Sequence, residues 1–239
     1  MTVAAVVPAA GRGERLGPGA AKALRVLAGR SLLAHAVARL RAAALVDLVV
    51  VAVPAGEAER LAAELGVVTV VGGADRRASV AAALAVLPAE VDVVLVHDAA
   101  RPLVPPRLVD AVARAVLDGA PAVVPGLPVA DTIKRVDADG WVLETPARAQ
   151  LRAVQTPQGF RRSVLERAHA LPRMATEPTD DAGLVELLGE PVLVVDGAEE
   201  AFKVTRPADL GRAEALLLSE APVPVAAGTP EQADGTDPT

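Results

Sequence analysis

The chain has 239 residues and a formal charge of −6, and apolar residues make up 52% of it. It contains no Cys and no Tyr, which excludes disulfides, thiolate metal sites and catalysis by a thiol or a phenol, and suits a reducing cytoplasm. Because Trp141, Phe160 and Phe202 are its only aromatic residues, we expect a core of Ala, Val and Leu and no aromatic platform for single-stranded nucleic acid.

The first half of the chain alternates Val-rich apolar runs with segments of helical periodicity. The apolar runs are nearly continuous, which is typical of strands covered on both faces. We expect strands over residues 3–7, 48–53, 67–71, 91–96 and 122–124, and helices over residues 31–43, 57–65, 79–87 and 107–117. This alternation predicts an α/β fold with a doubly wound, mostly parallel sheet, whose ligands bind beyond the carboxyl ends of the strands.

The pattern changes after Pro125. Asp139-Gly140, flanked by apolar residues, predicts a tight hairpin turn in a β-arm over residues 127–150. Such an arm buries little of itself, so it is either a surface decoration or a contact with a second subunit. Further on we expect a strand ending near Gln155, helices from Arg161 and over residues 180–188, strands over residues 192–195 and 202–204, and a final helix capped by Thr205.

The predicted organisation is one domain over residues 1–218 and a disordered acidic tail over residues 219–239. The tail holds four acids and no Lys or Arg, which leaves the rest of the chain at −2. This balance argues against a basic nucleic-acid-binding face but permits a local basic pocket. The first apolar run is only as long as a strand and follows no basic stretch, so we expect no signal peptide, and no apolar run is long enough to predict a membrane span.

The first expected strand leads into a loop of glycines and small residues. Backbone N–H groups in such a loop can converge on a phosphate. The loop is neither a dinucleotide fingerprint, because Leu16 replaces a glycine, nor a P-loop, because Ala23 follows Lys22. Residues 11–30 carry a local charge of +4, which could balance a triphosphate or could belong to a solvated basic loop; the cations are Arg12, Arg15, Lys22, Arg25 and Arg30.

Two further loops carry candidate ligands. Asp98 leaves the fourth expected strand, where one carboxylate can hold Mg²⁺ that bridges nucleotide phosphates. Arg101 could hold Asp98 or a substrate phosphate, or could pin the loop, and we expect His97 to be structural. After the third strand, Gly72-Gly73 permits close approach of a base, and Ser79 could bond the ligand or cap the next helix, capping being the commoner role.

Together these segments resemble one family. PAAGRGERLG followed by Lys22, GGADRRAS, HDAARP, ADTIKR, QTPQGF, PTDDAG and FKVTRPADL stand in the order and spacing of the 2-C-methyl-D-erythritol 4-phosphate cytidylyltransferases of the nonmevalonate isoprenoid pathway. The likeness covers residues 3 to about 217; HDAARP combined with KVTRP is specific, whereas PAAG with a lysine is shared by many nucleotidyltransferases. It implies a Rossmann-like nucleotidyltransferase fold and a homodimer.

The resemblance also implies residue roles. For CTP, the phosphates and ribose would be wrapped by Pro8, Ala9, Ala10, Gly11 and Gly13, and the cytosine read by Gly73 and Ser79. Arg15 and Lys22 would stabilise charge on the α-phosphate and the leaving pyrophosphate, and Asp98 would bind Mg²⁺. The acceptor would be held by Arg101, Thr132, Thr156 and Thr179, with its phosphate positioned by Lys203 and by Arg148 from the neighbouring subunit. Ala21 and Ala74 depart from the family pattern.

The implied reaction is in-line attack of the acceptor phosphate on the CTP α-phosphate. It needs positioning and charge neutralisation rather than an acid or a base, which fits a chain without Cys or Tyr. Two alternatives are the same chemistry on ribitol 5-phosphate and a non-catalytic module that binds sugar nucleotides. Of the three lysines, Lys22 and Lys203 fall at expected phosphate contacts, while Lys134, on the arm, has no clear role beyond a structural one.

Overall fold

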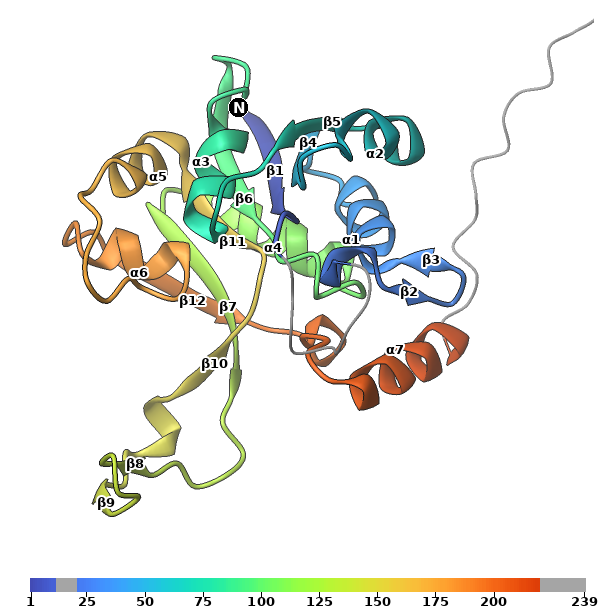
Figure 1. Ribbon diagram of the computed structural model, residues 1–239. Helices are drawn as coiled ribbons and strands as arrows, with labels where there is room; N and C mark the ends of the chain where they lie inside the picture. The colour runs from blue at the N-terminus through green and yellow to red at the C-terminus, as the bar shows by residue number, and fades with distance from the viewer. Residues whose placement is uncertain (12–20, 220–239) are drawn as a thin grey trace, which may run out of the picture.

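The computed structural model describes residues 1–11 and 21–219, and within them a central eight-stranded sheet organises the molecule (Figure 1). Its core runs in the order β5-β4-β1-β6, all parallel. On the other side of β6, the strand β11 is antiparallel to both β6 and β7, and β12 is parallel to β7. The strands are β1 Thr2–Pro8, β4 Leu48–Val53, β5 Val68–Val71, β6 Val91–Val96, β7 Ala122–Pro128, β10 Arg152–Val154, β11 Gln158–Arg161 and β12 Val192–Asp196.

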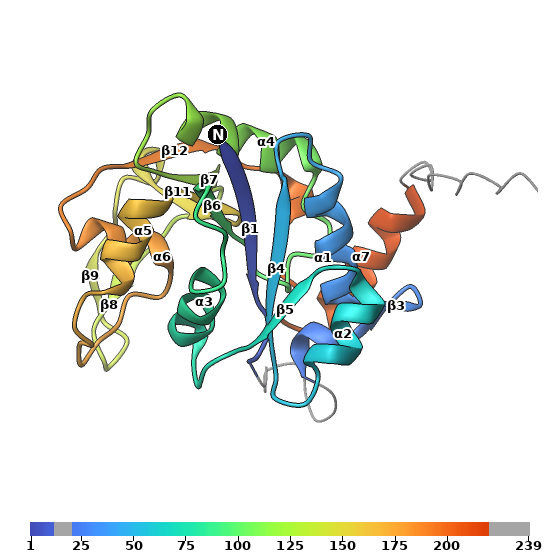
Figure 2. The same cartoon turned by 90° about the horizontal axis from the view of Figure 1, so that it is seen from above.

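Helices cover both faces of this sheet (Figure 2). One face packs against α1 (Leu32–Arg41), α2 (Ala58–Leu65) and α4 (Pro106–Leu117). The other packs against α3 (Arg76–Leu84), α5 (Arg162–His169) and α6 (Asp181–Glu186). The predicted doubly wound, mostly parallel α/β fold is confirmed, while the antiparallel β11 inside the sheet was not expected.

The core consists of small and branched aliphatic side chains, as the composition predicts. Along β1, Val3, Ala5 and Val7 face one helical layer, and Ala4 and Val6 face the other, because successive strand side chains point to opposite faces. Phe160 on β11 is the only aromatic side chain among the buried core residues of the described chain. Burial on both faces explains why β4 is continuously apolar and why β1 is apolar from Val3 onward.

Three expected details were wrong. The third helix begins at Arg76 rather than Ser79, because the Asp75 carboxylate caps it by accepting the Ala78 N–H at 2.8 Å. Residues 202–204 form no strand; they follow the 3₁₀ turn η4 (Glu199–Ala201), and the Val204 N–H donates to the Ala100 carbonyl. At α7 (Pro207–Ser219), Thr205 is not the acceptor of a cap, since it donates its own N–H and hydroxyl to the Asp209 carboxylate.

The arm is a real hairpin that extends away from the sheet (Figure 1). Its strands are β8 (Arg135–Val136) and β9 (Val142–Glu144), and its base is the antiparallel pair of β7 and β10. Asp137 shapes the turn by accepting the N–H groups of Asp139 and Trp141, and Gly140 takes a φ of +89°. Apolar side chains on the arm, such as Trp141 at 74% exposure, have little protein around them.

A second small hairpin was not expected from the sequence. The 3₁₀ turn η2 (Lys22–Leu24) leads into β2 (Val26–Leu27) and β3 (Arg30–Ser31), which pair with each other. α7 packs beside β2. No helix of the described residues is long and apolar enough to cross a membrane.

Candidate functional site

The site is a cavity at the carboxyl ends of β1 and β6. The two strands are neighbours, so the segments that leave them lie side by side: Pro8 to Gly11 after β1, and Asp98 to Ala100 after β6. The cavity has a volume of about 180 Å³ and is lined by Pro8, Ala9, Gly11, Lys22, Ala23, Asp98, Ala99, Ala100 and Lys203. The structure therefore brings together both lysines that the sequence singled out, the small-residue loop and the candidate metal ligand.

Asp98 is the central acid of this cavity. Its Oδ2 accepts from Lys203 Nζ at 2.7 Å, and its Oδ1 lies 3.4 Å from Arg76 Nε. Burial by itself would raise the pKa of Asp98, but the charges of Arg76, Lys203 and Arg101 hold that pKa below its ordinary value. The carboxylate is therefore ionised under all physiological conditions.

A buried hydrogen-bond chain holds Asp98 from behind. The Thr156 hydroxyl accepts the Asp98 N–H at 3.0 Å and lies 3.1 Å from His97 Nδ1. His97 Nε2 lies 3.2 Å from the carbonyl of Arg101, which can only accept, so Nε2 carries the proton and Thr156 donates to Nδ1. Burial lowers the pKa of His97 to about 4, so the ring is neutral. His97 is thus structural, and Thr156 fixes the Asp98 backbone; its contact with an acceptor stays a prediction.

The loops after β1 and β5 meet at a pair of glycines. A Cβ on Gly72 would lie 2.5 Å from Ala10 Cβ and 2.9 Å from Ser79 Oγ, so only glycine allows this approach. A Cβ on Gly73 would lie 2.3 Å from Ala78 Cβ. Ser79 is buried inside α3 and donates to the Asp75 carbonyl at 2.8 Å. Ala10, Gly73 and Ser79, all predicted to contact CTP, therefore share one corner.

Arg101 is engaged with the backbone of its own chain. Its Nη1 donates to the Ala201 carbonyl at 2.7 Å and its Nη2 to the Val154 carbonyl at 3.2 Å. Arg101 thereby ties β10 and η4 to the loop that carries Asp98. Its loop-pinning role is observed, and its contact with a substrate phosphate stays a prediction.

Thr179 lies apart from this cavity. It lines a second cavity of about 200 Å³, next to Arg76, Asp180 and Asp181. Thr179 is exposed, while Asp180 caps α6 by accepting the Gly183 N–H at 3.0 Å. Arg76 lines this second cavity and also contacts Asp98.

The predicted residues of the arm do not meet the cavity of their own chain. Thr132 and Arg148 are exposed on an arm that projects away from the sheet, and Arg148 donates to the Ala130 carbonyl at 2.6 Å (Figure 1). Lys134 donates to the Thr145 hydroxyl at 2.7 Å, which supports a structural role inside the arm. Gly13 and Arg15 lie outside the described residues, as does Arg12.

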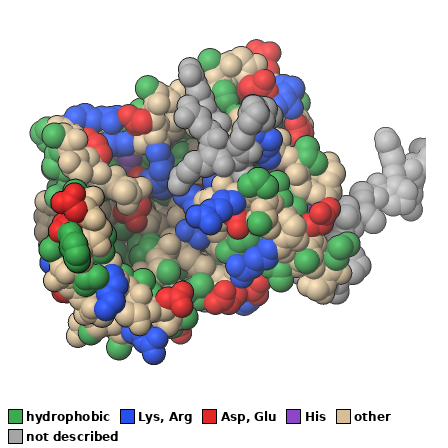
Figure 3. Space-filling model, turned by 60° about the horizontal axis from the view of Figure 1, so that its bottom comes forward, with side chains coloured by type: hydrophobic (Ala, Val, Ile, Leu, Met, Phe, Trp, Pro, Cys, Tyr) green, Lys and Arg blue, Asp and Glu red, His purple; other side chains and the backbone are tan. Residues whose placement is uncertain are grey.

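The surface around the site is basic. Figure 3, in which the lower end of the molecule as drawn in Figure 1 comes forward, shows Lys and Arg side chains gathered beside a hollow. Lys22 and Lys203 line the cavity, and Arg76 and Arg101 lie behind Asp98. This excess of cations over a single carboxylate suits a ligand that carries several negative charges.

Comparisons with known proteins place the chain in one family. The chain matches the family 2-C-methyl-D-erythritol 4-phosphate cytidylyltransferase over residues 3–219. It belongs to this family. It is 62% identical over 217 residues to the protein of that name from Frankia casuarinae, with 90% of this chain and 81% of the relative covered. A relative from Streptomyces avermitilis is 55% identical over 229 residues, with 90% and 91% covered.

The structural comparison agrees. The crystal structure of 2-C-methyl-D-erythritol 4-phosphate cytidylyltransferase from Thermus thermophilus matches with a TM-score of 0.74 at 42% identity, covering 90% of this chain and 98% of that one. Membership of the family identifies the chemistry as CTP-dependent cytidylyl transfer to 2-C-methyl-D-erythritol 4-phosphate in isoprenoid biosynthesis. The resemblance that the motifs carried is confirmed.

Sequence reasoning about this cytidylyltransferase missed three residues near the site. Arg76 contacts Asp98, and it also donates to Asp181, which is bonded to His169. Arg76 and Asp181 stand inside the quoted segments GGADRRAS and PTDDAG, but no role was predicted for either residue. Their position in the sequence could have pointed to them, because both are charged and stand in segments whose other residues were assigned to ligands.

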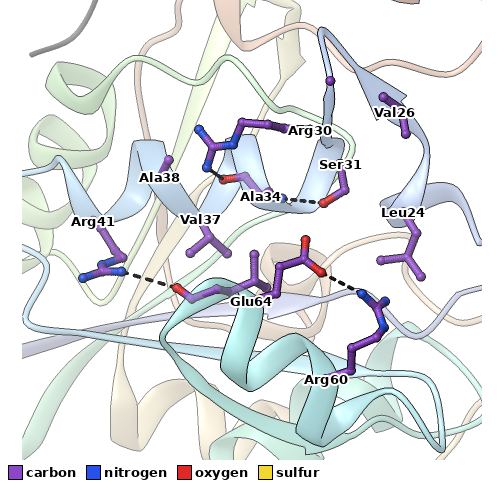
Figure 4. A pocket seen from close by; sticks show the side chains of 12 residues that line it. Leu24, Val26, Arg30, Ser31, Ala34, Val37, Ala38, Arg41, Arg60 and Glu64 are labelled. Atoms are coloured by element: carbon purple, nitrogen blue, oxygen red, sulfur yellow. Dashed lines mark hydrogen bonds and ion pairs between the residues drawn. The ribbon is translucent and has the colours of Figure 1, made fainter. Parts of the chain in front are cut away.

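A larger cavity, of about 630 Å³, lies between α1 and α2, away from Asp98 (Figure 4). Arg30 and Arg41 there donate to the carbonyls of Ala34 and Leu65, and Arg60 pairs with Glu64 at 2.7 Å. Arg30 therefore lines a different cavity from Lys22, which for this one of the five cations favours the alternative of a solvated basic loop. Asp98, Lys22 and Lys203 line the smaller cavity and not this one.

Proposed function

We propose that the cavity beside Asp98 is where this enzyme carries out cytidylyl transfer, with CTP seated across the loops after β1, β5 and β6. The observation that carries this proposal is the convergence of Lys22, Lys203 and ionised Asp98 on one cavity beside a small-residue loop. Cations so placed can neutralise a triphosphate.

The proposed CTP contacts divide by the part of the nucleotide they meet. Backbone groups of the first loop wrap the phosphates and ribose, and the corner formed by Gly73 and Ser79 takes the cytosine. Lys22 and Arg15 stabilise the negative charge that builds on the α-phosphate and the departing pyrophosphate. The first-loop residues are Pro8, Ala9, Ala10, Gly11 and Gly13.

The proposed acceptor contacts place its phosphate next to Lys203. An oxygen of that phosphate attacks the α-phosphorus in line, a new P–O bond forms, and the bond to the β-phosphate breaks to release pyrophosphate. Lys203 orients the attacking phosphate, with Arg148 of a second subunit on its other side. The remaining acceptor contacts are proposed at Arg101, Thr132, Thr156 and Thr179.

The donor set fits Mg²⁺ held partly by the nucleotide. The described residues contain no group of three or more His, Cys, Asp or Glu side chains that could hold a metal ion. Asp98 offers one ionised carboxylate in a cavity, and Mg²⁺ in nucleotide sites takes one or two carboxylates together with phosphate oxygens and water. Such an ion neutralises phosphate charge when bound, and Asp98 would hold it.

A homodimer is proposed on the evidence of the arm. Trp141, Val142 and Leu143 are exposed apolar residues on a projecting hairpin, which favours burial against another protein surface. Arg148 and Thr132 lie far from the cavity of their own chain, so a dimer would bring them to the cavity of the second copy.

The lack of Cys supports a cytoplasmic location.

The test is an acceptor and nucleotide assay. Pyrophosphate release is measured with CTP and Mg²⁺ and either 2-C-methyl-D-erythritol 4-phosphate or ribitol 5-phosphate, and with ATP in place of CTP as the control. We expect turnover with the methylerythritol phosphate and CTP only. Turnover confined to ribitol phosphate would contradict the proposed acceptor, and CTP binding without turnover with either acceptor would indicate a binding module.

A further inference from the structure

Arg76 joins the partly exposed carboxylate of Asp98 to the buried carboxylate of Asp181, in a different part of the cleft. Its Nε lies 3.4 Å from Asp98 Oδ1, and its Nη1 donates to Asp181 Oδ2 at 2.5 Å. His169 Nε2 lies 2.8 Å from the other oxygen of Asp181. With the 2.7 Å bond from Lys203 to Asp98, these contacts form a continuous row: Lys203, Asp98, Arg76, Asp181 and His169.

The far end of this row is buried and hydrogen-bonded. The Asp181 side chain is 1% exposed and the His169 side chain 5% exposed, and Asp181 is the first residue of α6. The preceding Asp180 caps α6, and Gln158 donates to its second oxygen at 2.6 Å. Arg76 itself begins α3, directly after the capping Asp75. Its guanidinium is thus held between α3, the start of α6 and the loop that carries Asp98.

The charges of the row depend on Arg76. Burial would raise the pKa of Asp181, and His169 and Arg76 hold that pKa below its usual range. Arg76 is therefore the shared counter-ion of two desolvated carboxylates. Without its guanidinium, Asp98 would keep the ion pair with Lys203 on its other oxygen, and its carboxylate could turn toward that lysine.

Arg76 links the two parts of the cleft that are proposed to bind the two substrates. Arg76 contacts Oδ1 of Asp98 and Lys203 contacts Oδ2, so the two cations together fix the plane of the carboxylate. Through Asp181, Arg76 also fixes the start of α6, next to Thr179. One side chain thus sets the spacing between the acid at the nucleotide cavity and the neighbouring cavity that Thr179 lines.

We propose that Arg76 is a positioning residue of the transfer reaction: it aims the Asp98 carboxylate into the nucleotide cavity and ties it to the Thr179 segment, with Asp181 and His169 as its anchor. This inference rests on the proposed role of Asp98. Its effect on the reaction is exerted through Asp98 and the α6 segment.

The test compares Arg76→Lys and Arg76→Gln with wild type. For Arg76→Gln we expect kcat to fall about 10- to 100-fold and the Mg²⁺ concentration for half-maximal activity to rise, as is typical when a residue that orients a metal ligand is lost. Calorimetric titration with CTP and Mg²⁺ should show weaker binding in the same variant, which gives a readout independent of turnover. Arg76→Lys keeps the charge and should recover part of each effect.

The matched control is Arg162→Gln. Arg162 is also a partly buried arginine, pairs with Glu166 at 2.8 Å and donates to the Pro88 carbonyl, but it lies on α5 away from the cavity. It should lower the melting temperature without moving the Mg²⁺ requirement or CTP binding. If Arg76→Gln folds poorly, Asp181→Asn, which loosens the anchor but retains Arg76, should shift the same two readouts in the same direction.

Two results would overturn the inference. One is a folded Arg76→Gln protein with wild-type kcat, Mg²⁺ requirement and CTP binding. The other is an Arg76→Gln protein that, like Arg162→Gln, differs from wild type only in a lower melting temperature. Asp98→Asn separates this failure from failure of the proposed site. If Asp98→Asn is inactive while the Arg76 variants are normal, only the role of Arg76 is wrong; if Asp98→Asn is fully active, the proposed site itself is wrong.

Discussion

Each oxygen of the Asp98 carboxylate contacts a cationic side chain, and this governs what single residues can do in the site. Lys203 and Arg76 keep the carboxylate ionised and oriented. Lys22 lines the same cavity from the opposite loop. In a chain in which lysine makes up only 3 of 24 basic residues, two lysines at one small cavity favour compact ammonium groups that meet phosphate oxygens.

Replacing Lys22 by alanine should lower kcat by about two to three orders of magnitude, because a preorganised charge that stabilises the transition state is lost. Steady-state pyrophosphate release measures the change, and circular dichroism checks the fold. Arg30→Ala is the control, since it removes a charge nearby in the sequence whose side chain lines the other cavity, and it should be close to wild type. Equal losses in the two variants would contradict the assignment of Lys22.

At the scale of elements, the sequence predicts what local pattern determines. The strands β4 and β6 have the predicted bounds, because both are runs of largely buried aliphatic residues, interrupted in β6 by the exposed Asp92. The strand β11 was missed because its four residues, QGFR, carry no such pattern and are held by pairing with β6 and β7. α3 was started three residues late because its first turn is polar and its cap is Asp75 rather than Ser79.

The residues of the site also divide into those that a local sequence pattern predicts and those that it does not. The small-residue loop, Lys22, Asp98 and Lys203 could be predicted because each stands in a short motif at the end of a strand or before a helix. Arg76 could not, because its partners Asp98 and Asp181 lie 22 and 105 residues away along the chain. Contacts of that kind depend on how α3, α6 and the loop after β6 pack together.

At the scale of the whole molecule, the arm separates residues that the family resemblance groups together. Arg148 and Thr132 lie on the projecting arm, whereas Lys22 and Lys203 line the cavity of the body (Figure 1). A site that uses both sets therefore needs two copies of the chain, which is the geometry of a symmetric dimer with shared sites.

Mixed dimers test this arrangement. Arg148→Ala and Lys22→Ala subunits should each be nearly inactive alone, and dimers formed from one of each should regain up to about half of the activity of one wild-type dimer, because one of the two sites is then intact. The measurement is pyrophosphate release after co-refolding or co-expression, with dimer composition checked by mass spectrometry. No recovery in verified mixed dimers would argue against a shared site.

The most direct test of the account is a crystal structure of the enzyme with CTP and Mg²⁺. We expect the triphosphate to lie between the loop after β1 and Asp98, with Lys22 Nζ within hydrogen-bonding distance of the α-phosphate and the cytosine at the corner of Gly73 and Ser79. CTP bound instead in the cavity between α1 and α2, or with its phosphates remote from Lys22 and Asp98, would contradict it.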